Sequence, residues 1–138
     1  MKKIILLNAV LFFSFTLTAQ CFETLTFGAA HTVGKKSNGT LWGWGFGLAG
    51  QLLTLNETEP LPIQLGTATD WSYVKNGETN TFAIKNNGTL WGCGSNQYGK
   101  LGVNSGAMNF TTFQQITTAT NWVKVAPTQG YTLALKAD

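Results

Sequence analysis

The chain has 138 residues, of which 43% are hydrophobic, only 11% are charged and 16 are glycine. This balance excludes a disordered chain and favours a turn-rich β protein of ordinary domain size. The formal net charge is +3, arginine is absent, and the lysines are scattered along the chain. Because arginine supplies the bidentate donors that bind phosphate and guanine, we expect no nucleic-acid partner.

Residues 1–20 are predicted to form a secretory signal peptide. Two lysines precede an apolar run from Ile4 to Phe15, and a short polar stretch ends at Gln20. The apolar run is shorter than the roughly 20 residues that span a bilayer, which favours a cleaved signal over a membrane anchor. A lipid anchor on Cys21 is a weaker alternative, because Gln20 is bulky where lipoprotein signals carry a small residue. We therefore expect a secreted or cell-surface protein.

An internal repeat follows the signal. Residues 37–52 align with residues 86–101 at an offset of 49, and both segments contain the sequence NGTLWG. A further offset of 51 places the sequence TFAIK, which ends at Lys85, on TLALK, which ends at Lys136. The predicted units are residues 22–70, residues 71–121, and the start of a third at 122–138. Periods of this length indicate a solenoid, a propeller or an array.

Each unit is predicted to contain four short β-strands. Phe82 and Ile84 alternate with Ala83, which gives the period of two that is typical of a strand. The Asn-Gly pairs that follow predict hairpins with type I′ turns. Two prolines, Pro60 and Pro62, should confine their segment to a sheet edge or a strand start. At about fifty residues, such a unit has the size of one propeller blade.

The predicted fold class is therefore all-β, a partial β-propeller with about two complete four-stranded blades and the start of a third. Glycine recurs in the strand that returns from each hairpin, which suggests close approach by another backbone. The repeat-motif residues, interpreted as packing and turn residues, are Asn38, Gly39, Trp42, Gly43, Gly45, Gly50, Leu52, Asn87, Gly88, Trp91, Gly92, Gly94, Gly99, Leu101 and Gly102.

The exported chain would contain two cysteines, Cys21 and Cys93, in a compartment that permits disulfides. Cys93 lies in a strand pattern at the position that Trp44 occupies in the preceding repeat. We interpret it as a buried thiol that packs as a small hydrophobic group. A disulfide between Cys21 and Cys93 is the alternative.

The combined motif resembles the regulator of chromosome condensation repeat family, in its secreted bacterial type. The matching sequences are HTVGKKSNGTLWGWG from His31 with AGQL, and TFAIKNNGTLWGCG with YGKLG. The resemblance implies a ring of about seven blades, so we interpret the chain as an N-terminal fragment of a longer protein. The first unit departs from the family pattern, with Gly34 and Lys35 in place of alanine and an aliphatic residue and Leu53 where the second unit has Gly102.

No arrangement typical of an enzyme occurs in the sequence. The single histidine, His31, becomes Asn80 in the second unit, which favours a local hydrogen-bonding role over catalysis. No His or Cys cluster has the spacing of a zinc site, and no calcium loop or phosphate-binding loop is complete. We predict a non-enzyme without cofactor or metal. Of the four Asn-x-Ser/Thr sequons, those at Asn38 and Asn87 are interpreted as turn residues.

The predicted function is that of a secreted or cell-surface scaffold that binds an extracellular protein or a glycan through variable loops. Five loop residues differ between otherwise matching units and are the candidate contacts: Phe46, Leu48, Asn96, Gln97 and Tyr98. One alternative, implied by the resemblance, is a regulator or inhibitor of another enzyme, since family members promote nucleotide exchange on a small GTPase and some secreted relatives inhibit β-lactamase. The other is a structural repeat array within a larger surface protein.

Overall fold

The computed structural model describes residues 21–138, so the predicted signal peptide lies outside the described residues. The strands are β1 (Phe22–Phe27), β2 (His31–Lys36), β3 (Leu41–Phe46), β4 (Thr58–Gln64), β5 (Trp71–Asn76), β6 (Asn80–Lys85), β7 (Leu90–Ser95), β8 (Asn109–Gln115), β9 (Trp122–Pro127) and β10 (Thr132–Lys136), with a 3-10 turn η1 (Gln97–Gly99) after β7.

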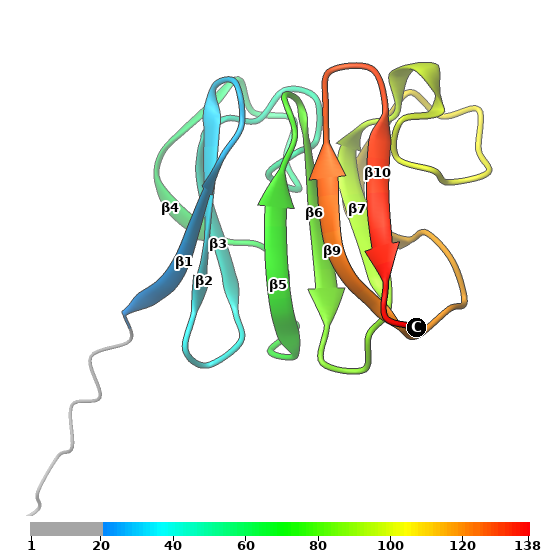
Figure 1. Cartoon of the computed structure of the whole chain (residues 1–138). Helices are drawn as coiled ribbons and strands as arrows, with labels where there is room; N and C mark the ends of the chain where they lie inside the picture. The colour runs from blue at the N-terminus through cyan, green and yellow to red at the C-terminus, as the bar shows by residue number, and fades with distance from the viewer. Residues whose placement is uncertain (1–20) are drawn as a thin grey trace, which may run out of the picture.

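The strands form three antiparallel sheets that stand side by side (Figure 1). The first blade has the order β1-β2-β3-β4, the second has β5-β6-β7-β8, and β9 pairs with β10 in a third sheet. The first strand of the second blade, β5, contacts both β1 and β9, so the three first strands lie next to one another. The predicted partial β-propeller, with two four-stranded blades and part of a third, is confirmed.

The spaces between the sheets are filled by two hydrophobic clusters. The first joins the first and second blades and contains Val33, Leu41, Leu52, Leu65, Trp71, Val74 and Ala83. The second joins the second blade to β9 and contains Phe82, Ile84, Leu90, Leu101 and Val125. Burying a side chain such as Leu41 or Phe82 stabilises the fold by about 1.5–3 kcal/mol. The blades are therefore held together mainly by apolar packing between neighbouring sheets.

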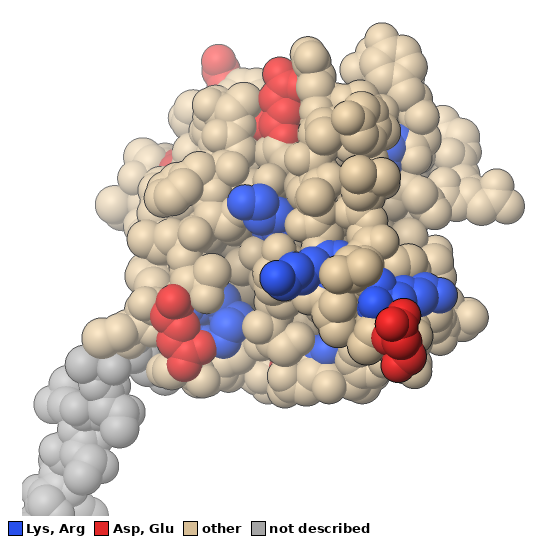
Figure 2. Space-filling view, viewed as in Figure 1, with Lys and Arg blue, Asp and Glu red and all other residues tan. Residues whose placement is uncertain are grey.

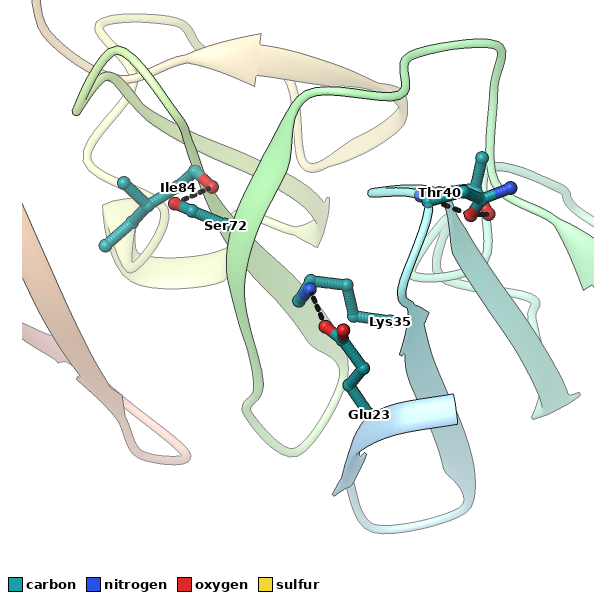
Figure 3. A network of polar contacts seen from close by, with 6 residues as sticks. Glu23, Lys35, Thr40, Ser72 and Ile84 are labelled. Carbon is teal, nitrogen blue, oxygen red and sulfur yellow. Dashed lines mark hydrogen bonds and ion pairs between the residues drawn. The ribbon is translucent and has the colours of Figure 1, made fainter. Parts of the chain in front are cut away.

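A β-bulge recurs at the second residue of each first strand. Glu23, Ser72 and Val123 have no Cα partner in the ladders that their neighbours form. The Ser72 hydroxyl donates to the carbonyl of Ile84 at 2.9 Å. Glu23 instead forms an ion pair with Lys35 on β2 (Figure 3). The bulge is therefore common to the three sheets, while the contacts made by the side chain of the bulged residue differ between the first and second blades.

The Asn-Gly hairpins have a different turn from the predicted one. A type I′ turn needs positive φ at both central residues, but at residues 38–39 and 87–88 only the glycines have it, with φ of 75° at Gly39 and 76° at Gly88. The amide of Gly39 donates to the carbonyl of Lys36, which closes a turn one residue earlier. The Asn38 side chain favours this arrangement because its Oδ1 accepts from both the amide and the hydroxyl of Thr40.

These Asn-Gly-Thr turns (residues 38–40 and 87–89) also attach each blade to the next. The indole of Trp42 donates to the Thr40 hydroxyl at 3.0 Å, and the carbonyl of Gly39 accepts from the amide of Trp71, the first residue of β5. In the second turn, the Gly88 carbonyl accepts from the amide of Trp122 in the same way. The NGTLWG motif therefore joins a hairpin, an indole and the start of the following blade.

The remaining structural expectations concern strand edges and close contacts. The segment with both prolines is β4, which lies at the outer edge of its sheet as predicted. Close backbone approach is also found at Gly94, where φ is 93° and an added Cβ would lie 2.6 Å from the Thr79 carbonyl oxygen. Cys93 is fully buried and Cys21 is exposed, and both thiols are free. The buried-thiol interpretation is confirmed, and the alternative disulfide is absent between these two residues.

Candidate functional site

The loops at one end of the blades carry four of the five predicted contact residues, and the fifth, Phe46, ends β3 directly before one of these loops. We define the upper face as residues 28–30, 47–57, 77–79, 96–108 and 128–131, which connect strands at the top of Figure 1. The Asn-Gly-Thr turns and the links between blades lie at the opposite, lower end. Propellers recognise partners through such end loops, because the packed sheets hold the loops in place while the loop sequences vary.

A polar cleft of about 460 Å³ opens on the upper face where the second blade meets the third sheet. It is lined by Glu78, Thr79, Gln97, Tyr98, Lys100, Gln129 and Gly130. These residues come from three separate connections, which are the β5–β6 turn, the β7–β8 loop and the β9–β10 turn. The cleft combines hydrogen-bonding amides, one carboxylate, one ammonium group and an aromatic ring, and it is therefore suited to a polar ligand.

Tyr98 is the most prominent side chain of this cleft. It is 83% exposed and its backbone has a φ of 62°, one of only two positive values among the non-glycine residues 21–138. A side chain in this region of φ/ψ space is strained and persists only where its surroundings impose it. The turn that imposes it runs from the Asn96 carbonyl to the amide of Gly99 at 2.8 Å. The loop thus holds Tyr98 in a strained backbone conformation that exposes its aromatic ring to solvent.

Asn96 is not available for contact, although the sequence predicted it as a loop contact. It is only 5% exposed, and its side-chain oxygen accepts from the amide of Leu101 at 3.1 Å. Its side-chain nitrogen donates to the carbonyls of Ser105 and Ala107. Because a short amide side chain can hydrogen-bond several neighbouring backbone groups, Asn96 holds the β7–β8 loop together.

The other predicted contacts divide between the cleft and the first blade. Gln97 and Tyr98 line the cleft. Phe46 ends β3 and is half-buried, and its amide donates to the Ala30 carbonyl. Leu48 is 51% exposed in the β3–β4 loop and does not line the cleft. The structure therefore brings two of the five predicted residues together with residues that the sequence did not single out.

Lys100 is the least expected member of the cleft because it is a buried cation. Only 7% of the residue is exposed. Its Nζ donates to the hydroxyl of Thr79 at 3.0 Å and to the carbonyl of Gln129 at 3.2 Å. Among residues 21–138 no carboxylate lies within ion-pairing distance of this ammonium group. The sequence alone could have drawn attention to Lys100, because the matching position of the first unit holds the neutral Gln51.

His31 belongs to a buried network between the first two blades. Its Nε2 lies 3.2 Å from the hydroxyl of Thr81, and that hydroxyl donates to the Gln51 carbonyl at 2.9 Å. The Thr81 proton is thereby used, so Nε2 of His31 is the donor in this contact, as it is in one tautomer of the neutral ring. Burial lowers the pKa of His31 to about 4, which agrees with this neutral form. The hydrogen-bonding role that the sequence indicated is the one observed.

The Cys93 thiol is also buried and unsuited to act as a nucleophile. Burial raises the pKa of the Cys93 thiol, so it stays protonated. Within residues 21–138 no three His, Cys, Asp or Glu side chains are grouped so that they could hold a metal ion. No helix in this part of the chain is long and apolar enough to cross a membrane.

The lysines, which are scattered in the sequence, gather in space over the lower half of the side shown in Figure 2. The repeat places Lys36, Lys85 and Lys136 at matching positions at the ends of β2, β6 and β10. Each ammonium group lies over a tryptophan ring, at 3.7 Å from the Trp42 centroid in the first blade and 4.7 Å from the Trp122 centroid in the third sheet. These lysines pack against their own blades.

Comparison with known proteins supports the family resemblance and the fold. Residues 77–100 match the sequence model of the regulator of chromosome condensation (RCC1) repeat. No curated protein matches the chain by sequence.

Solved structures give a broader match. A yeast RCC1 protein, Prp20, whose structure was solved bound to Kap60, is 24% identical with a TM-score of 0.78, and 89% of this chain covers 29% of it. Prp20p from Saccharomyces cerevisiae, studied for its binding to Gsp1p and histones, is 17% identical with a TM-score of 0.72 over 88% of this chain and 32% of that one. Human WBSCR16 is 16% identical with a TM-score of 0.71 over 86% and 31%. The chain thus spans about a third of the solved structures that it matches.

Proposed function

Because this chain carries repeats of the regulator of chromosome condensation type on a propeller fold, we propose that it is a non-catalytic, exported scaffold that binds a partner protein through its upper face. The observation that carries the proposal is the upper-face cleft with its exposed, strained Tyr98. Tyrosine is enriched at protein interfaces because it buries a large apolar ring and keeps a hydroxyl for hydrogen bonding.

Three features support a binding role over catalysis. His31 and Cys93 are buried in hydrogen-bonded or apolar positions away from the cleft. The cleft has one carboxylate, Glu78, and no second acid beside it that could share general acid and base work. Among the solved structures of similar fold, Prp20 was solved bound to Kap60 and was studied for its binding to Gsp1p and histones.

The binding role is tested by capture of a partner with the full chain. The exported chain is immobilised and exposed to the extracellular protein fraction of its source, and the bound proteins are identified by mass spectrometry. We expect Tyr98→Ala to reduce capture of a specific partner at least about tenfold, as for an interface hot spot. The control is Leu61→Ala, which removes a comparably exposed side chain from the outer edge strand. Equal capture by wild type and Tyr98→Ala, or equal loss in both variants, would contradict the role of the upper face.

Export is tested separately, because residues 1–20 lie outside the described structure. Fusion of this segment to a reporter protein should direct the reporter out of the cytoplasm, and the mass of the exported product should show cleavage near Gln20. A reporter retained at full length in the cytoplasm would exclude export. The propeller and its cleft do not depend on this result.

A further inference from the structure

The cleft contains an ammonium group whose surroundings are unusual for a buried charge. Charged side chains are almost never fully buried unless they are paired, because removing them from water is costly. Lys100 is 7% exposed, yet its two acceptors, the Thr79 hydroxyl and the Gln129 carbonyl, are both neutral. An ammonium group has three N–H donors, so one remains without a protein partner among residues 21–138.

The matching position of the first blade shows that the fold does not require this charge. Gln51 is 1% exposed there, and its side-chain oxygen accepts from the amide of Ala49 at 3.0 Å. Both loops then continue into the same turn, in which the amides of Leu53 and Gly102 donate to the carbonyls of Gly50 and Gly99. A neutral residue is therefore sufficient for packing, and the second blade has a cation where packing does not need one.

We propose that Lys100 is the carboxylate-binding residue of the upper-face cleft, and that it recognises an acidic side chain of the partner protein. This inference rests on the proposed binding function and names the chemistry of that site. Thr79 and Gln129 fix the ammonium group from two sides, so that a carboxylate entering the cleft meets a pre-positioned donor. Tyr98 borders the same cleft and supplies apolar contact area beside the charge.

The probe for this subsite is acetate, with acetamide as its neutral isostere. Both are titrated into the isotopically labelled full chain at constant ionic strength, and the amide NMR signals of Thr79, Gln129 and Gly130 are followed. We expect saturable shift changes with acetate that acetamide does not produce. Lys100→Gln should abolish them, and this variant carries the residue that the first blade tolerates at the matching position. Glu78→Gln should increase acetate affinity several-fold, because Glu78 places a like charge in the same cleft.

Two results would overturn the assignment. One is an equal response to acetate and acetamide, and the other is an acetate response that persists in Lys100→Gln. An absent acetate response in a protein whose partner capture still depends on Tyr98 would overturn the carboxylate assignment alone and leave the binding function standing. Restored acetate binding in Lys100→Arg, measured in the same titration, would support a role for the charge itself over a loss of loop structure.

Discussion

The first and second blades share strand order and ladder register. They differ in the size of the side chain at matched positions, according to whether another sheet packs against that position. The second blade packs between the first blade and the β9–β10 sheet, and it holds Cys93 with no exposed surface. The first blade has a neighbouring sheet on one side only among residues 21–138, and it holds the half-buried Trp44 at the same position, with its ring centroid 5.8 Å from that of Phe22. The size of a repeat residue is thus limited by the adjacent blade.

The largest effect is expected when the first-blade residue is transferred to the second blade. Cys93→Trp would place an indole where the Sγ atom lies 3.7 Å from the Gln51 carbonyl of the first blade. Because overpacking of a closed site forces the sheets apart, we expect a loss of at least about 3 kcal/mol in the free energy of unfolding, measured by urea titration. The reverse change, Trp44→Cys, should cost about 1–2 kcal/mol through lost apolar contact. Equal costs for the two changes would contradict the comparison.

The Asn-Gly-Thr turns should behave alike in both blades. Gly39 and Gly88 have positive φ, and a Cβ at either residue would overlap a backbone carbonyl oxygen, that of Thr69 or that of Thr120. We expect Gly39→Ala and Gly88→Ala each to lower the free energy of unfolding by about 2–3 kcal/mol. Gly106→Ala is the control, because nothing lies within 4 Å of its added Cβ. A cost confined to one blade would show that the turns are not equivalent.

His31 of the first blade should make the free energy of unfolding depend on pH, whereas its counterpart in the second blade, Asn80, does not titrate. His31 keeps a pKa of 6.5 in the unfolded chain and about 4 in the folded one, since burial disfavours its charged form. As the pH is lowered below 6.5, His31 takes up a proton in the unfolded chain but not in the folded one. The free energy of unfolding therefore decreases as the pH is lowered to about 4, and this group has little effect on it above pH 7. Wild type should lose about 2 kcal/mol more than His31→Asn between pH 7 and pH 5.

The His31→Asn variant carries the residue of the second blade, Asn80, and serves as the matched reference. Urea unfolding of both proteins at the two pH values gives the comparison. Identical pH dependence of the two proteins would show that His31 is accessible to protons in the folded state.

A smaller effect is expected at a turn that recurs inside the β3–β4 and β7–β8 loops. Leu53 and Gly102 occupy matching positions with φ of 57° and 76°. Gly102→Leu should cost about 1 kcal/mol, because the left-handed region strains a side chain and the added Cβ would lie 3.2 Å from a methyl group of Ile116. Leu53→Gly should change stability less, since relief of strain and loss of packing oppose each other. Thermal unfolding of both variants measures the difference, and a stabilising Gly102→Leu would contradict this explanation.

The repeat made much of the fold predictable, because strand position, edge position and glycine placement depend on local sequence. The buried state of Cys93 and the edge position of Pro60 and Pro62 followed from the pattern. The type of the Asn-Gly turn did not, since it depends on how the side chain of Asn38 is used. The cleft could be predicted only in part, because Glu78, Lys100 and Gln129 are brought together by packing between sheets.

The Asn-Gly-Thr turns have a consequence for how such a protein can change over evolutionary time. They set the start of each following blade from the lower end, through the Gly39 carbonyl to Trp71 and the Gly88 carbonyl to Trp122. The length of an upper loop does not alter the strand register: the β7–β8 loop, residues 96–108, is two residues longer than the β3–β4 loop, residues 47–57, and the ladder registers of the two blades still correspond. Loop length can therefore change without a shift in strand register, so the residues that contact a partner and the residues that set the blade architecture can diverge independently.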